Sequence, residues 1–321
     1  MVVVAAVVVA AAAVAADGVV ETERMNMTNI KHILNMAVVA ASLAIAPATL
    51  AQTTYPTPEA AADALVDGIA RHDGDAIKAV IGPDYRTYIP AGSVDPVDVT
   101  NFLAAWADAH KIVPAGADKA LLGAGRHGWT LPIPIVKVAG GWRFDTKVAP
   151  EEMRIRRIGR NELAAIQVAL AYTDAQKEYH ARDWDGDGVL QYASRALSSP
   201  GKHDGLYWAS LPGELESPLG AEFADAKPGQ PYHGYLYKIL TAQGANAPGG
   251  ARSYLKSGRM TDGYALVAWP AKYDDTGVMT FIVNQDGVVY EKNLGASTDA
   301  VARAMKAYDP DASWQKVPLA K

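Results

Sequence analysis

Residues 156–192 constrain the fold more than any other stretch, because they join a long helical pattern to an acidic, glycine-rich loop. Almost every side chain in residues 163–171 is apolar, so this part of the helix has almost no polar face. Farther along, apolar side chains recur at helical spacing only at Tyr172, Ala175 and Tyr179. The pattern predicts a helix that begins inside a core and ends at a surface.

The sequence also indicates where this helix begins and ends. Asn161 is the predicted N-cap, because a short polar side chain there can accept a hydrogen bond from the first turn. We expect the helix to end near Arg182, because aspartate and glycine alternate after it and both favour turns.

The acidic loop carries the most specific chemical signal in the chain. Asp183, Asp185 and Asp187 alternate along the loop and Gly188 follows, which reproduces the first half of a calcium-binding EF-hand loop. Three carboxylates this close repel one another unless a cation joins them. The pattern predicts a calcium site formed by these three side chains and the backbone carbonyl of Val189.

The second half of the loop departs from the EF-hand pattern. Ser194 stands at the twelfth position, where the bidentate glutamate is expected, and Gln191 stands at the ninth. A further carboxylate must then come from elsewhere, such as Asp204. We therefore expect weak affinity, with a dissociation constant of about 10⁻⁴–10⁻³ M. The alternative is a turn of aspartate and glycine that binds no ion.

Composition excludes some classes of function. The net charge is −5 and the sequence has no basic run, so nucleic-acid binding is not expected. The chain contains no cysteine, which excludes thiol catalysis and disulfides.

The N-terminal residues 1–51 are interpreted as a start-site extension followed by a signal peptide. Lys31 precedes an apolar run over residues 33–46, and small residues at Thr49 and Ala51 fit a cleavage site. The extension ahead of Met25 repeats a hydrophobic segment with no evident purpose, so translation is expected to start at Met25 or Met27.

Export with cleavage is favoured over a membrane anchor. The apolar run is shorter than the ~20 residues that span a bilayer, and Pro47 interrupts it. We expect a periplasmic or secreted protein with no membrane span after cleavage.

The pattern of helices and strands in the rest of the chain predicts an α+β protein with two domains. Residues 55–148 contain helical patterns followed by a hairpin, in which Gly140 and Gly141 join residues 131–138 to residues 142–144. Helices followed by a curved antiparallel sheet are similar to the nuclear-transport-factor-two-like (NTF2-like) fold. Residues 152–318 contain the long helix and then an antiparallel meander.

The clearest hairpin lies in this second domain. Two strands are predicted at residues 278–283 and 288–292, joined by the turn Asn284-Gln285-Asp286-Gly287. Gly287 can take the left-handed conformation that closes this turn. The long helix and the meander together resemble the globular part of type IV pilins and of type II secretion pseudopilins. The chain lacks the membrane-embedded N-terminal half-helix of those proteins.

Several long motifs resemble an uncharacterised family of exported bacterial proteins, domain-of-unknown-function family 2950. They include RRIGRNELAAIQVALAYTDAQKEY, DWDGDGVLQYA, SSPGKHDGLYW and PYHGYLYKILTAQG. The resemblance covers nearly all of the chain after the signal peptide. It implies an exported protein and no particular activity.

Loop histidines offer the alternative function, an envelope hydrolase. His203, Asp204 and His233 lie in glycine-rich loops beside aromatic residues, where a general base could line a cleft. Histidines in such loops also serve as surface or hydrogen-bonding residues. Convergence of the three side chains in one cleft would favour the hydrolase.

Two further groups of side chains have a binding and a structural interpretation. Four arginines near the helix start could hold an anion or pair with carboxylates of the other domain. Exposed aromatics could stack on a glycan, bind an envelope protein or belong to the core. The arginines are Arg154, Arg156, Arg157 and Arg160, and the aromatics are Tyr207, Trp208, Tyr232, Tyr235 and Tyr237. The sequence thus favours a non-enzymatic, calcium-stabilised envelope protein that binds an unidentified partner or ligand.

Overall fold

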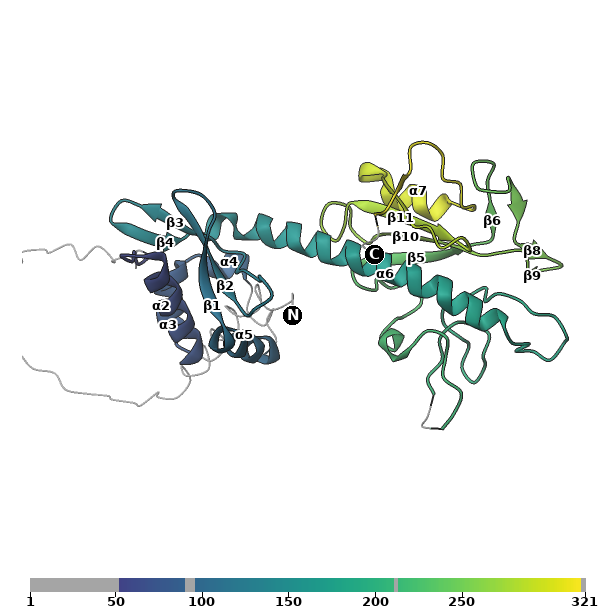
Figure 1. The fold of residues 1–321 in the computed structure, drawn as a ribbon, viewed down its shortest axis with the longest axis horizontal. Helices are drawn as coiled ribbons and strands as arrows, with labels where there is room; N and C mark the ends of the chain where they lie inside the picture. The colour runs from purple at the N-terminus through teal and green to yellow at the C-terminus, as the bar shows by residue number, and fades with distance from the viewer. Residues whose placement is uncertain (1–51, 90–95, 211–212, 319–321) are drawn as a thin grey trace, which may run out of the picture. The chain divides into compact units, whose positions relative to one another are not determined.

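The computed structural model describes residues 52–89, 96–210 and 213–318 and shows an α+β protein (Figure 1). The chain divides into two compact units, one extending to Met153 and the other beginning at Arg154. The predicted signal peptide and its extension lie outside the described residues. None of the helices in the described ranges is long and apolar enough to cross a membrane.

The N-terminal unit begins with helices that cover its sheet. Thr57 caps the first helix by accepting a hydrogen bond from the backbone N–H of Ala60 at 3.2 Å, and Pro58 occupies the first helical position. The helices are α2 (Pro58–Ala70), α3 (Gly74–Ile81), α4 (Tyr85–Tyr88) and α5 (Pro96–Asp108).

Four antiparallel strands complete this unit. Their order in the sheet follows the chain: β1 (His110–Pro114), β2 (Lys119–Ala124), β3 (Ile135–Val138) and β4 (Gly141–Phe144). The predicted hairpin forms between β3 and β4, with Ile135 opposite Phe144. Strand β3 begins only after Pro134, because proline has no N–H for the ladder. Strands β1 and β2 were not predicted.

Helix α6 (Ala149–His180) is 32 residues long, and its start differs from the sequence-based prediction. Asn161 lies inside the helix and does not cap it. The first turn contains Pro150, Glu151 and Glu152, and these residues favour a helix start because proline suits the first turn and carboxylates suit the positive end of the helix dipole. The helix ends close to the predicted position.

The C-terminal unit contains a five-stranded antiparallel sheet beside α6. Its strands lie in the order β13 (Gln315–Lys316), β12 (Tyr290–Asn293), β11 (Met279–Asn284), β10 (Ala265–Pro270) and β5 (Tyr235–Leu240). The predicted hairpin forms between β11 and β12, and Gly287 takes a φ of +71° in its turn. Short helix α7 (Thr298–Ala304) packs on β10.

Two two-stranded ladders project from this unit between β5 and β10. One pairs β6 (Ala242–Gln243) with β7 (Arg252–Ser253), and the other pairs β8 (Leu255–Lys256) with β9 (Arg259–Met260). They matter for the candidate site because β9 brings Arg259 to the acidic loop.

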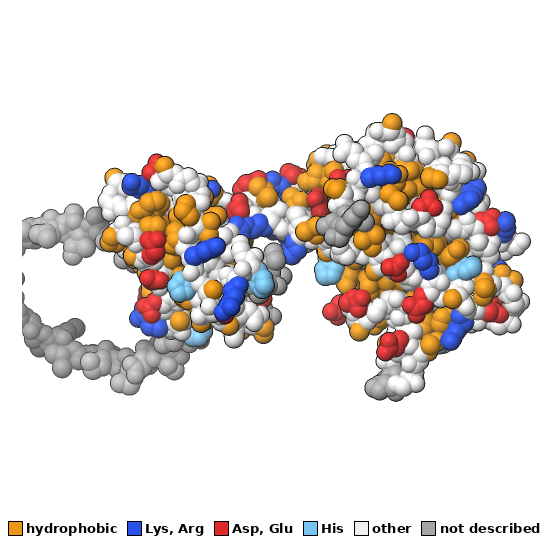
Figure 2. All heavy atoms as spheres, viewed as in Figure 1, with side chains coloured by type: hydrophobic (Ala, Val, Ile, Leu, Met, Phe, Trp, Pro, Cys, Tyr) orange, Lys and Arg blue, Asp and Glu red, His pale blue; other side chains and the backbone are white. Residues whose placement is uncertain are grey.

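Each unit has its own cluster of buried apolar side chains. Phe102 and Phe144 are buried in the first cluster, and Trp106 and Trp142 pack against it. The second cluster joins α6 to the sheet, where the Tyr172 hydroxyl donates to the carbonyl of Ala265 at 3.2 Å. The second cluster includes Trp269 and Phe281, and Leu170 packs against it. On the face drawn in Figure 2, charges of both signs lie between hydrophobic side chains over the C-terminal unit.

A long connection, residues 181–234, joins α6 to β5. It contains the acidic loop, the 3-10 helix η3 (Ala221–Phe223) and several turns. In Figure 1 this green chain extends from the end of α6 and returns to the sheet. The connection therefore carries most of the residues that sequence analysis selected for function.

Candidate metal centre

The acidic loop is shaped around Asp183. Its Oδ2 accepts a hydrogen bond from the backbone N–H of Gly188 at 2.7 Å, and its Oδ1 accepts one from Gly186 at 2.9 Å. Both glycines have positive φ, 83° for Gly188 and 73° for Gly186, which favours glycine at each position. The hydrogen bond from Gly188, together with that from Gly186, lowers the pKa of Asp183 below its usual value.

The three aspartates predicted as metal ligands converge. One carboxylate oxygen from each of Asp183, Asp185 and Asp187 lies within 4.8 Å of the others, and the last two side chains are exposed. Such a cluster of oxygens can hold a hard cation, which reduces the repulsion between the carboxylates. The loop therefore provides a chemically suitable metal site near the surface.

Other groups in the protein already contact two of these carboxylates. Arg259 forms an ion pair with Asp187, and Gln191 donates from Nε2 to Oδ2 of Asp185 at 3.0 Å. No sequence pattern connects Arg259 with the loop, because strand β9 brings it there from far along the chain. A bound cation would compete with the Arg259 guanidinium for Asp187.

Val189 was predicted as a ligand through its backbone carbonyl. Its N–H donates to Oδ1 of Asp187 at 3.0 Å, so the backbone of Val189 lies next to the cluster. The role of its carbonyl stays a prediction.

Helix α6 holds both ends of the loop. At one end, Trp184 donates from Nε1 to the carbonyl of Tyr179 at 2.7 Å and stacks on the Tyr179 ring. At the other end, the buried Gln176 side chain forms two hydrogen bonds of 2.8 Å with the backbone of Ala193. A loop held in this way loses less conformational entropy when it binds an ion.

The residues of the alternative hydrolase make separate contacts. Asp204 accepts hydrogen bonds from the N–H and the hydroxyl of Ser199, at 2.7 and 2.9 Å. His203 packs against Trp208, with ring centroids 4.3 Å apart, and His233 packs against Tyr232. In the described part of the chain, no hydrogen bond or ion pair joins these three residues to one another.

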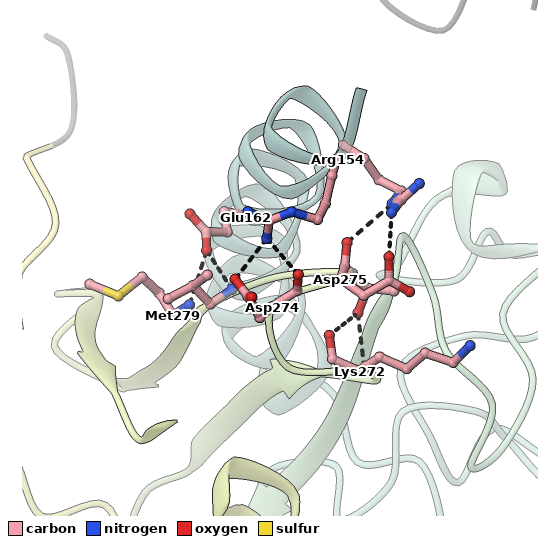
Figure 3. A network of polar contacts seen from close by, with 9 residues as sticks. Arg154, Glu162, Lys272, Asp274, Asp275 and Met279 are labelled. Atoms are coloured by element: carbon pink, nitrogen blue, oxygen red, sulfur yellow. Dashed lines mark hydrogen bonds and ion pairs between the residues drawn. The ribbon is translucent and has the colours of Figure 1, made fainter. Parts of the chain in front are cut away.

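Two of the four arginines at the start of α6 form ion pairs with carboxylates of the C-terminal unit (Figure 3). Arg154 donates to Asp274 at 2.7 Å, and Arg157 forms an ion pair with Asp275. Both aspartates lie in the turn between β10 and β11. Burial, followed by the charge of Arg157, lowers the pKa of Arg160.

Hydrogen bonds that involve the backbone of the β10–β11 turn also attach the start of α6 to this turn. Glu162 accepts hydrogen bonds from the N–H groups of Val278 and Met279, both at 2.9 Å (Figure 3). Asn161 donates to the carbonyl of Thr276 at 2.9 Å. The start of α6 within the C-terminal unit is thus fixed to the β10–β11 turn, and this network has a structural role.

The candidate aromatic surface is divided between core and connection. Tyr235 is fully buried and donates to the carbonyl of Met279 at 2.8 Å, and Trp208 is buried beside Trp184. Tyr207, Tyr232 and Tyr237 are half-buried. These five aromatics therefore do not form one exposed stacking surface.

Comparison with known sequences places the chain in a family. A family model described as "Protein of unknown function (DUF2950)" matches residues 52–317. The chain belongs to this family. No curated protein and no solved structure matches the chain. Family membership confirms the resemblance of the motifs and assigns no activity, so the argument for function depends on the sites themselves.

Proposed function

We propose that this protein is a non-enzymatic binding protein of the cell envelope whose acidic loop binds calcium. The convergence of three carboxylate oxygens within 4.8 Å carries the proposal. Calcium prefers oxygen ligands in flexible geometry, and the loop offers carboxylates without histidine or thiolate. In this proposal Asp183, Asp185, Asp187 and the carbonyl of Val189 are the protein ligands.

The surroundings of the loop support weak binding. Because Asp185 and Asp187 are exposed, solvent screens the charges of the site, and Arg259 offsets one of them. A dissociation constant of about 10⁻⁴–10⁻³ M suits an extracellular module that meets millimolar calcium. The ion would stiffen the loop and the start of the connection, which leads directly to the aromatic residues around Trp208.

Thermal unfolding with and without calcium tests the proposal. At about a tenfold excess over its dissociation constant, calcium bound only to the folded state contributes about 1.4 kcal/mol. This corresponds to a rise of roughly 3–5 °C in Tm for a domain of this size. The measurement compares wild type with Asp185→Ala, an exposed substitution, and the variant should lose most of the rise.

The control is Asp174→Ala, which removes an exposed carboxylate from the surface of α6 and leaves the loop intact. It should respond to calcium as wild type does. An equal rise in Tm for wild type and Asp185→Ala would mean that the loop is only a turn.

Export is part of the same proposal. The basic start, apolar run and small residues of the 25–51 segment support it. N-terminal sequencing of protein recovered from the periplasm should give a first residue near Gln52. Retention of the whole chain in the cytoplasm would contradict export.

We also propose fold relationships for the two units. Helices α2, α3 and α5 with a four-stranded meander support an NTF2-like N-terminal unit, and α6 with an antiparallel meander supports a pilin-like C-terminal unit. Under this proposal the partner is an envelope protein or a glycan, bound by the C-terminal unit.

A further inference from the structure

The C-terminal unit contains a cavity of about 710 Å³ that nothing above assigns a role. One wall is α6, and a second is formed by β5 and β10. The connection lines the remaining side with residues 195–197 and with residues between Leu219 and Tyr232. Arg303 of α7 lies on its border. Pockets for small molecules commonly measure about 300–1,000 Å³, so this cavity has the size of a ligand site.

The walls of the cavity are mainly apolar. Tyr172 and Val168 contribute from α6, Leu266 and Trp269 from β10, and Phe223 from η3. Tyr172, Leu266, Trp269 and Phe223 belong to the buried core, so the wall they form is held by packing. An apolar body could enter this cavity without leaving polar groups of the wall unsatisfied.

The charged residues that line the cavity are all cationic. They are Arg195, Lys227, Lys238 and Arg303, and none of the lining residues, all of which the structure describes, is acidic. Asp204 offsets Arg195 and Asp299 offsets Arg303, whereas Lys227 and Lys238 have no ion pair among the described residues. In a chain with a net charge of −5, this local excess of positive charge at an apolar cavity favours an anion.

Two of these cations, Lys238 and Arg303, form several hydrogen bonds within the protein. The Lys238 ammonium donates to the backbone carbonyls of Ala302 and Arg303, at 3.0 and 2.6 Å, so it holds the C-terminal end of α7. Arg303 forms hydrogen bonds of 2.9 Å to Asp299 and lies over the Trp269 ring. The Asp299 carboxylate offsets the charge of Arg303, and the donors of both cations are largely occupied.

The other two cations lie on the connection. Arg195 donates to the Ser199 hydroxyl at 2.6 Å and lies 3.5 Å from Asp204, so part of its guanidinium is engaged. Lys227 is exposed, and its ammonium forms no hydrogen bond or ion pair within the described ranges. Lys227 can therefore contact a ligand without first breaking a hydrogen bond or ion pair within the protein.

We propose that this cavity binds an amphipathic anion, with an apolar body inside the cavity and one carboxylate or phosphate group at Lys227 and Arg195. The apolar walls and the cations together support an amphipathic anion as the ligand. Apolar walls alone would suit a neutral ligand, and cations alone would suit a small ion. The cavity and the acidic loop share no residue, so the two sites can succeed or fail separately.

Calorimetric titration of the full chain with single-chain amphiphiles tests the proposal. Dodecanoate and dodecyl phosphate, each below its micelle concentration, represent the two head groups. Dodecyltrimethylammonium carries the same chain with a positive charge, and acetate and inorganic phosphate carry the anion without the chain. We expect saturable binding at one site for at least one dodecyl anion, and at least tenfold weaker binding for the other three compounds.

Two pairs of variants locate the binding. Lys227→Glu reverses the charge at the cavity and should weaken binding about fivefold or more, whereas Lys202→Glu makes the same change at an exposed residue of the connection outside the cavity. Ala226→Trp should fill the cavity and weaken binding at least tenfold, whereas Ala224→Trp adds the same side chain at an exposed position outside it.

The outcomes separate the possible ligands from failure of the proposal. Binding of dodecanoate alone identifies a carboxylate ligand such as a fatty acid, and binding of dodecyl phosphate alone identifies a phosphate-bearing lipid. Equal binding of the cationic amphiphile would overturn the proposal, as would equal effects of Lys227→Glu and Lys202→Glu. Absence of binding by both dodecyl anions would also overturn it, whatever the result for calcium.

Discussion

Gly234 shows how closely the backbone before β5 approaches helix α6. It has a φ of +75°, and a Cβ at this position would overlap Nδ2 of Asn161. That amide is buried and donates to the carbonyl of Thr276. A larger residue at position 234 would therefore disturb a buried hydrogen bond as well as strain the backbone.

The substitution Gly234→Ala tests this contact, and Gly201→Ala is its matched control. Gly201 has a φ of +71° and nothing within 4 Å of a Cβ, so the control carries the backbone strain of about 1–2 kcal/mol without the overlap. We expect Gly234→Ala to lower the free energy of unfolding by about 1–3 kcal/mol more, measured by urea denaturation.

The same substitution in an Asn161→Ala variant tests whether the overlap with the Asn161 amide causes the loss of stability. In Asn161→Ala the overlapping amide is absent, and of the three nearest atoms only Cβ of Thr276, at 3.3 Å, remains close to the added Cβ. Most of the difference between Gly234→Ala and Gly201→Ala should then disappear. If Gly234→Ala cost the same with and without Asn161, the overlap would not explain its effect.

Helix α6 is attached to the β10–β11 turn by contacts of unequal strength. Glu162 is half-buried and accepts two backbone N–H groups, whereas Arg157 and Asp275 form an ion pair between side chains that are 41% and 45% exposed. Hydrogen bonds to a charged acceptor contribute more than exposed ion pairs, because water screens the latter. The attachment should depend mainly on Glu162.

Alanine substitutions measure this difference. We expect Glu162→Ala to lower the free energy of unfolding by about 2–3 kcal/mol, and Asp275→Ala by less than about 1 kcal/mol. Glu162→Gln keeps an acceptor oxygen and should fall between them. A larger loss of unfolding free energy in Asp275→Ala than in Glu162→Ala would mean that the attachment depends mainly on the ion pair.

The elements that the sequence predicted well have local signals. Thr57 followed by Pro58 predicts the start of α2, and the turn ending at Gly287 predicts the β11–β12 hairpin, because caps and turns depend on neighbouring residues. The start of α6 has such a signal in Pro150 and the two glutamates after it, whereas Asn161, the predicted N-cap, lies inside the helix.

The remaining features of the site depend on tertiary structure. The three aspartates were predicted because their spacing is local, whereas Arg259 approaches Asp187 only through the β8–β9 ladder. The cavity likewise joins α6, two strands and a connection with little regular structure, and no sequence period marks such a combination. Distant side chains that meet through irregular chain leave no pattern in a single sequence.

The two units should unfold independently, because each has its own apolar core. The boundary after Met153 lies inside α6, and Ala149 is fully buried in the first core. We expect residues 154–321 to unfold cooperatively alone. Residues 52–153 should be more stable than residues 52–148, because the shorter fragment lacks Ala149 and Met153.

Calorimetry of the three fragments and the full chain measures this. Two transitions in the full chain, each matching one fragment, would support separate cores. A single transition in the full chain, with no cooperative unfolding of either fragment, would require one shared core.

Terbium luminescence excited through tryptophan tests whether the acidic loop binds calcium. Terbium takes oxygen ligands as calcium does, and Trp184 lies between two of the proposed ligands, so an ion in the loop would be sensitised by it. We expect saturable emission that calcium displaces, and loss of emission in both Asp185→Asn and Trp184→Phe. Emission that is unchanged in Asp185→Asn, or that calcium does not displace, would contradict it.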